Sequence, residues 1–164
     1  MRKALEKLHQ IIFKIETKVL ILAFAVMGII MAFQVFSRTL FGRSIVWSEE
    51  LTRHIFIWTT FIGMSYGIAR LSHINLDYFI LKFPSKIRKI IEIIMNLVLF
   101  GMLITLFRFS LVYVVDQIEI KGPTTGYSMG YVMAAMPVSC VLGAIHLIYH
   151  LINQITSLNM EKSS

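Results

Sequence analysis

Charged residues are scarce in this chain of 164 residues, of which 15% are charged and 57% are hydrophobic. That balance excludes an ordinary soluble domain, in which about a quarter of the residues are charged. Acidic residues are fewer than basic residues, 9 against 16, which gives a formal net charge of +7. Cations near membrane ends orient a chain and attract anionic lipid, so nucleic acid is not needed to explain them. We therefore expect an integral membrane protein whose partners include lipids and exclude nucleic acid.

Cysteine is almost absent, and the single residue, Cys140, excludes a disulfide within the chain and any cysteine-built metal site. Its hydrophobic surroundings predict a small packing residue. The sequence has no Gly-rich phosphate loop, no Ser-His-Asp arrangement in a suitable order and context, and no pair of carboxylates at mid-membrane. We see no internal repeat of the kind from which carriers are built. We expect no enzyme, no catalytic, substrate-binding or metal-binding residue, and no cofactor bound by this chain.

What the chain does have is long uncharged runs, each close to the roughly 20 residues that cross a bilayer at about 1.5 Å per residue. They predict an all-α integral membrane protein with four transmembrane helices, preceded by an amphipathic surface helix. That first segment alternates apolar residues at helical spacing with lysines, and no persuasive cleavage site follows it, so we expect the first span to stay. The predicted segments are the surface helix at 1–18, spans at 19–37, 47–71, 87–115 and 129–151, and a cytoplasmic tail at 152–164.

Basic residues predict the orientation of these spans. Five lie in segment 1–18 and five in segment 70–89, whereas the loop after the first span has two and the loop after the third has one. Cytoplasmic loops carry the excess of Lys and Arg, so both termini are expected in the cytoplasm. The second span then begins at the outer surface.

Ionic groups stand at both ends of the predicted second span. Glu49 and Arg53 are four residues apart, as are Glu50 and His54, so each acid would lie beside a basic or titratable partner on a helix. Arg108 falls inside the predicted third span, where an unpaired arginine is costly. We expect it to pair with Glu49 or Glu50 near the outer surface or to reach the interface.

Small residues predict where helices approach each other closely. Gly63 and Gly67 have the small-xxx-small spacing that brings helix backbones together in lipid. Two further series in the fourth span's region recur every fourth residue and are expected to do the same, and Pro137 is expected to kink that helix. These series are Gly122, Gly126 and Gly130, then Ala135, Ser139 and Gly143.

Histidines leave one alternative open. His73, His146 and His150 all fall near the expected cytoplasmic ends of helices, and histidines on facing helices can hold a b-type haem. A haem-bearing anchor of a respiratory complex is therefore a second candidate. Alanine at His73 or His146 would then abolish the Soret band. A small transporter that works alone is a third candidate.

Between Trp47 and Asp77 the chain has an ordered set of residues: Trp47-x-Glu49-Glu50-Leu51, then Arg53, Trp58, Phe61-x-Gly63, Arg70, His73-Ile74 and Asp77. This set resembles the signature of the small membrane subunit of TRAP transporters, the DctQ-like family. It implies a bacterial inner-membrane scaffold packed against a large multi-span subunit that carries solute and sodium, served by a periplasmic binding protein. It also implies an organic acid as cargo, of the dicarboxylate or sialic acid type, and coupling to a sodium gradient.

The residues expected to hold this fold or to contact the partner subunit come mainly from that region. Arg70, His73 and Asp77 are expected to form an anchor at the inner end if the second helix continues past Leu71. The loops at 38–50 and 116–126 are expected to face the binding protein. The full set is Trp47, Glu49, Glu50, Arg53, Trp58, Gly63, Gly67, Arg70, His73, Asp77 and Arg108.

Overall fold

The computed structural model describes residues 2–42, 45–70 and 85–162, and nearly all of them are helical. The helices are α1 (Arg2–Phe41), α2 (Val46–Arg70), α4 (Ser85–Gln117), α5 (Met129–Met133) and α6 (Ala135–Lys162). Within these ranges the only β pairing is an isolated bridge between Lys121 and Ser128, in the loop that joins α4 to α5. The predicted all-α class is confirmed for the described residues.

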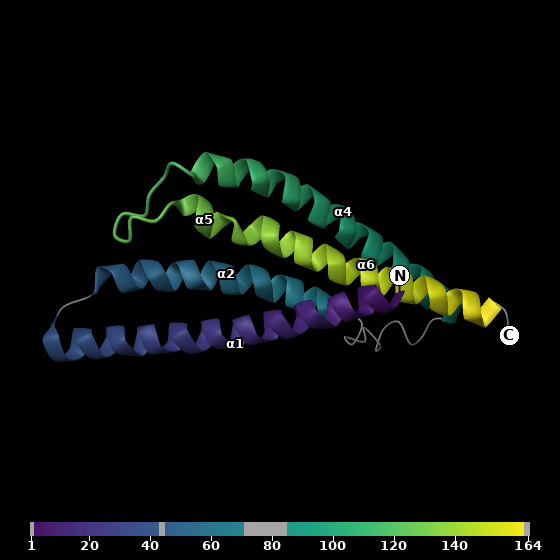
Figure 1. Ribbon diagram of the computed structural model, residues 1–164, viewed down its shortest axis with the longest axis horizontal. Helices are drawn as coiled ribbons and strands as arrows, with labels where there is room; N and C mark the ends of the chain where they lie inside the picture. The colour runs from purple at the N-terminus through teal and green to yellow at the C-terminus, as the bar shows by residue number, and fades with distance from the viewer. Residues whose placement is uncertain (1, 43–44, 71–84, 163–164) are drawn as a thin grey trace.

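The long helices lie side by side in the order α1, α2, α6 and α4 (Figure 1). Contacts between elements agree with this order, because α6 packs against both α2 and α4 while α1 packs mainly along α2. Both termini lie at one end of the molecule, and the loop between α4 and α5 lies at the other (Figure 1). A polar side chain at either end can therefore meet partners that are distant in sequence.

Three helices in the described part of the chain are long and apolar enough to cross a membrane, namely those within Leu5–Leu40, Ile93–Gln117 and Met129–Gln154. α2 is not among them, although it covers most of the predicted span 47–71. Its buried side chains include Glu50, His54 and Ser65, which lower its apolar content. A fourth crossing by α2 therefore stays a prediction.

One continuous helix, α1, covers both the predicted surface helix at 1–18 and the predicted span at 19–37. The apolar face expected for the surface helix does not pack on the rest of the chain, because Leu8, Ile15 and Val19 are exposed. Glu16 is buried instead, with 2% of its surface exposed. The structure thus shows no separate surface helix, since no proline or glycine interrupts the chain between the two segments.

The interruption predicted at Pro137 is found between α5 and α6. Proline has no N–H to donate to the carbonyl four residues earlier, here that of Met133, which ends α5. The flanking bonds persist: Ala134 N–H donates to the Gly130 carbonyl at 2.9 Å, and Val138 N–H donates to the Ala134 carbonyl at 3.2 Å. Beyond the predicted span end at 151, α6 continues to Lys162 in place of the expected tail.

The predicted small-residue face of α6 is buried between α2 and α4. Ala135 and Ser139 are fully buried, and a Cβ at Gly143 would lie 2.9 Å from Ile68 of α2 and 3.7 Å from Leu103 of α4. Small side chains therefore let α6 approach both neighbours, as expected. The adjoining core comprises Ile68, Leu103, Cys140 and Leu147.

Gly130 offers a test of this close packing. A Cβ there would lie 3.0 Å from Cα of Ile118, a backbone atom that cannot move aside cheaply. Gly130→Ala should therefore destabilise the chain by about 1–3 kcal/mol, the usual cost of overpacking. Thermal unfolding in detergent micelles measures the loss as a lower Tm.

The matched control is Gly28→Ala on α1, where an added Cβ meets no atom within 4 Å. Alanine favours the helix over glycine by up to about 1 kcal/mol, so this variant should unfold at the same temperature or slightly higher. Equal unfolding temperatures for the two variants would contradict the packing described at Gly130.

Candidate functional site

Polar side chains gather at the two ends of the helical layer. We call Glu50, His54, Thr124 and Thr125 the loop-end cluster, because they join α2 to the loop between α4 and α5. We call His9, Glu16, Ser65, His146 and His150 the terminal-end cluster, because they join α1, α2 and α6 nearer the chain termini. Each cluster is centred on one buried carboxylate.

In the loop-end cluster, Glu50 binds the loop with both of its oxygens. Its Oε2 accepts hydrogen bonds from the backbone N–H of Thr124 at 2.8 Å and of Thr125 at 3.0 Å. Its Oε1 accepts the Thr125 hydroxyl at 2.8 Å. Bonds to an ionised acceptor are stronger than those between neutral groups, so this carboxylate fixes the loop to the start of α2.

Glycines allow the loop to approach Glu50. A Cβ at Gly122 would overlap the Glu50 carboxylate. Gly126 has φ of +70°, a left-handed backbone that favours glycine, and its N–H donates to the Gly122 carbonyl at 3.0 Å. In the predicted series of three glycines, Gly122 and Gly130 thus serve close approach, whereas Gly126 serves a turn.

The other predicted residues at this end have separate positions. His54 Nε2 lies 3.8 Å from Glu50 Oε1, so the predicted neighbours do meet, while Glu49 Oε1 accepts a hydrogen bond from Gln34 of α1 at 2.9 Å. Trp47 and Arg53 are exposed, and Trp58 is half-buried. The Glu49–Arg53 pair is not among the ion pairs of the described residues.

The predicted pairing of Arg108 with Glu49 or Glu50 was wrong for the part of the chain that the structure describes. Arg108 is exposed on α4 and takes part in none of the ion pairs there. α6 lies between α2 and α4, and the oxygens of Glu50 are already taken by Thr124 and Thr125 (Figure 1).

In the terminal-end cluster, the Glu16 carboxylate of α1 meets both neighbouring helices. Ser65 of α2 donates its hydroxyl to Oε1 at 2.6 Å, and Nε2 of His146 on α6 lies 3.1 Å from Oε2. Nδ1 of His146 lies 2.7 Å from Nδ1 of His9, which returns the network to α1. Ser65 and His146 are fully buried. The network therefore holds three helices together through groups that water does not reach.

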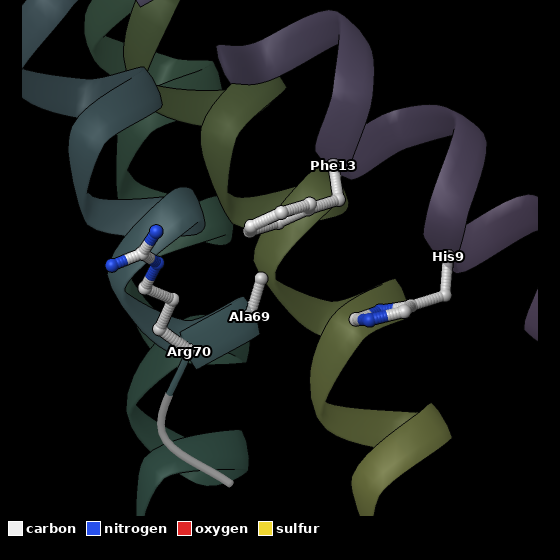
Figure 2. A pocket seen from close by; sticks show the side chains of 4 residues that line it. All are labelled: His9, Phe13, Ala69 and Arg70. Carbon is white, nitrogen blue, oxygen red and sulfur yellow. The ribbon is translucent and has the colours of Figure 1, made fainter. Parts of the chain in front are cut away.

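A pocket of about 380 Å³ adjoins this network and is lined by His9, Phe13, Ala69 and Arg70. Figure 2 shows His9 and Phe13 reaching from α1 toward the end of α2, where Ala69 and Arg70 lie. The guanidinium of Arg70 lies 5.1 Å from the centre of the Tyr66 ring, a cation–π arrangement. Of the predicted inner anchor, Arg70 is thus placed, whereas His73 and Asp77 lie outside the described residues.

Gly63 and Gly67 do not bring another of the described helices close. A Cβ added at either position meets no atom of the described residues within 4 Å. Ser65, between them in sequence, is fully buried and points to the other side of α2. The predicted small-xxx-small pair therefore lies on a face of α2 that the described helices leave open.

Of the three histidines considered for haem, His146 and His150 are engaged in hydrogen bonds, and His73 lies outside the described residues. Both ring nitrogens of His146 have partners, and Nε2–H of His150 donates to the Ala69 carbonyl at 3.1 Å. Neither nitrogen of His146 is therefore available to an axial ligand bond without breaking the cluster. Across the described ranges, no set of three or more His, Cys, Asp or Glu side chains is arranged to hold a metal ion.

Sequence reasoning missed His9, Glu16 and Ser65 as a group. A signal was present, because His9, Phe13 and Glu16 have the i, i+4 and i+7 spacing that places residues on one helix face. It was obscured by the apolar residues at neighbouring positions, which suggested a different packing face.

The loop-end cluster yields a direct test. Glu50→Ala should leave the N–H groups of Thr124 and Thr125 without their acceptor, at a cost of about 1–3 kcal/mol if they stay buried. The loop should then detach, and hydrogen–deuterium exchange of a peptide covering 118–128 should be faster. Glu119→Ala, which removes an exposed carboxylate from the same loop, is the control. Unchanged exchange in the Glu50 variant would show that the carboxylate does not hold the loop.

Comparison with known proteins identifies the family. Residues 26–157 match the family model described as tripartite ATP-independent periplasmic transporters, DctQ component. The chain is 33% identical over 84 residues to the sialic acid TRAP transporter small permease protein SiaQ of Vibrio cholerae, covering 51% of this chain and 49% of that protein. It is 35% identical over 60 residues to the C4-dicarboxylate small permease protein DctQ of the same organism, covering 37% of this chain and 26% of that protein.

A longer relative aligns as well. The sialic acid TRAP transporter permease protein SiaT of Haemophilus influenzae is 29% identical over 118 residues, covering 72% of this chain and 19% of that protein. The chain thus spans half or less of the length of each of these relatives. Because the family model extends over most of the sequence, this chain belongs to the DctQ family of TRAP transporter membrane components.

Proposed function

We propose that this chain is the small scaffold subunit of a TRAP transporter, packed against a large permease subunit that moves the solute. The observation that carries the proposal is the family match over residues 26–157. The structure adds a physical reason. The two buried carboxylates among the described residues, Glu16 and Glu50, are both occupied by hydrogen bonds within the chain. Their oxygens are therefore not available to coordinate a sodium ion or to face a charged solute.

The proposed membrane arrangement has four spans, with α2 as the fourth crossing. α2 packs against both α1 and α6, so its buried Ser, Thr and His side chains face protein and need not meet lipid. α1 and α4 carry most of the exposed apolar side chains, such as Phe24, Ile29 and Val98. The excess of basic residues favours cytoplasmic termini in a bacterial inner membrane.

The proposed cargo is an organic acid taken up with a sodium gradient, and no cofactor is bound by this chain. Relatives named for sialic acid and for C4-dicarboxylate support this chemical class. The loop held by Glu50 and the region around Trp47 would face the periplasm and the solute-binding protein. The Glu50→Ala variant tests this as well, because a detached loop should weaken docking of the binding protein to the assembled transporter.

The open face of α2 is the proposed contact with the large subunit. Gly63 and Gly67 have room for added atoms, and small residues at this spacing let helices of two subunits approach closely. Trp58 and Arg70 lie on the same helix, half-buried and exposed respectively. The predicted interface residues His73 and Asp77 follow α2 in the sequence and lie outside the described residues.

A tagged copy of the chain should recover a much larger multi-span membrane protein from its own host's membranes. Vesicles that contain both subunits should take up organic acid only with the binding protein and an inward sodium gradient. Vesicles that contain this chain alone should take up none. Transport by the isolated chain would overturn the scaffold proposal.

Larger side chains at Gly63 and Gly67, on the open face of α2, should prevent the two subunits from associating. Gly63→Leu with Gly67→Leu adds side chains where this chain has empty space, so its own Tm should change little. Recovery of the large subunit should fall at least tenfold, because each leucine would clash with the partner helix. Gly28→Leu on α1, also in open space, is the control and should leave recovery unchanged. Full recovery with both leucines would place the interface elsewhere.

A further inference from the structure

The terminal-end cluster forms a continuous line of hydrogen bonds from a buried hydroxyl to the wall of a pocket. The line runs from Ser65 to Glu16 at 2.6 Å, from Glu16 to His146 at 3.1 Å, and from His146 to His9 at 2.7 Å. Its inner members are almost fully buried, whereas His9 is half-buried and lines the pocket. Every member except Ser65 has a side chain that can bind or release a proton.

The bond between the two histidines limits where protons can lie. Both contacting atoms are Nδ1, and a hydrogen bond of 2.7 Å between two ring nitrogens needs one N–H donor and one bare acceptor. His9 and His146 therefore cannot both carry a proton at Nδ1, and they cannot both lack one there.

The buried Glu16 carboxylate then determines how many protons Glu16, His146 and His9 favour together. An ionised Glu16 without a cation would be a buried net charge, which is costly. One proton shared between Glu16 and His146 removes that charge, whether the proton lies on the carboxyl oxygen or on Nε2 of His146. In both arrangements the Nδ1–H of His146 donates to His9, and His9 carries its own proton at Nε2. A doubly protonated His9 would also balance the charge, but it would share the pocket with the guanidinium of Arg70 and is disfavoured by that like charge.

After one proton is lost from this neutral state, a single arrangement of the remaining protons keeps both hydrogen bonds of His146. His146 then keeps only its Nε2–H, which donates to the Glu16 carboxylate, and its Nδ1 becomes an acceptor. His9 must in turn carry its proton at Nδ1. The proton from Nδ1 of His146 has moved to Nδ1 of His9, and the proton from Nε2 of His9 has left the cluster.

We propose that Glu16, His146 and His9 form a proton-binding site that takes up and releases one proton as a unit, with His9 exchanging it through the adjoining pocket. The site binds no metal or solute in this proposal. The line ends at Ser65, a hydroxyl that is already donating to Glu16, so it is a binding site and not a path across the membrane.

Neighbouring groups on all three helices face the site. Tyr149 of α6 stacks on the His9 ring with centroids 4.2 Å apart, and the ring of His150 lies edge-on to His9 at 5.6 Å. From α2, the Tyr66 ring stacks on Phe13, and the guanidinium of Arg70 lies over the Tyr66 ring. The positive charge of Arg70, which also lines the pocket, favours the state with one proton fewer.

Because the same bonds join α1 to α2 and α6, proton occupancy also sets how firmly these helices are held. With the proton bound, the buried cluster has no net charge. After release it carries one negative charge between the helices, which weakens the packing of α1.

The test uses the full chain in lipid nanodiscs with 15N-labelled histidine, and follows the ring nitrogens by NMR as pH is varied. Signals are assigned with single His→Gln variants. His9 and His146 should change together at one midpoint, and the bare nitrogen of His9 should switch from Nδ1 at low pH to Nε2 at high pH. Independent midpoints, or a His9 tautomer that does not switch, would overturn the proposal.

Two variants separate a shared proton from mere packing. Glu16→Gln keeps the shape but removes the charge, so the shared step should split or disappear; Glu6→Gln, an exposed acid on the same helix, should leave it intact. Ser65→Ala removes a donor that stabilises the ionised carboxylate, so the shared midpoint should move to higher pH. A Glu16→Gln variant that titrates like the unaltered chain, or an unmoved midpoint in Ser65→Ala, contradicts the site.

Discussion

A polar group between helices that face lipid must find its partner inside the protein, because the surrounding hydrocarbon offers none. The two clusters meet this requirement at opposite ends of the layer. Glu50 joins α2 to the loop between α4 and α5, and Glu16 joins α1 to α2 and α6. Since each carboxylate accepts more than one hydrogen bond, each fixes several parts of the chain at once. Together the two acids connect α1, α2, α6 and the loop after α4.

The same requirement explains why the least apolar of the long helices lies inside the layer and not at its edge. α2 contains Ser48, Thr59 and Ser65 among its buried residues, and it lies between α1 and α6. Thr59 bonds the carbonyl four residues earlier at 2.7 Å, so it is satisfied within its own helix. α1 and α4, at the edges of the layer, instead expose large apolar side chains. Composition and position therefore agree, although α2 alone would not be recognised as a span.

Sequence patterns predicted features that depend on one helix, and they failed where two distant helices meet. The segments expected at 47–71 and 87–115 correspond to Val46–Arg70 and Ser85–Gln117, and Pro137 interrupts its helix as expected. Arg108 was misassigned because charge complementarity does not reveal that α6 separates α4 from α2. Glu16 and His146 are 130 residues apart, and nothing in their local sequence indicates that they meet.

The placement of these contacts bears on how the proposed scaffold could hold a second subunit. A helix that bonds its own chain on every face has no surface for a second subunit, whereas one bonded on no face has no fixed shape. α2 avoids both conditions, because Ser65 is bonded to Glu16 on one side while Gly63 and Gly67 stay open on the other. A partner helix at that open face would meet a surface whose position is already fixed by the clusters at its two ends. Binding would then cost little ordering of α2, which is the advantage of a preformed interface.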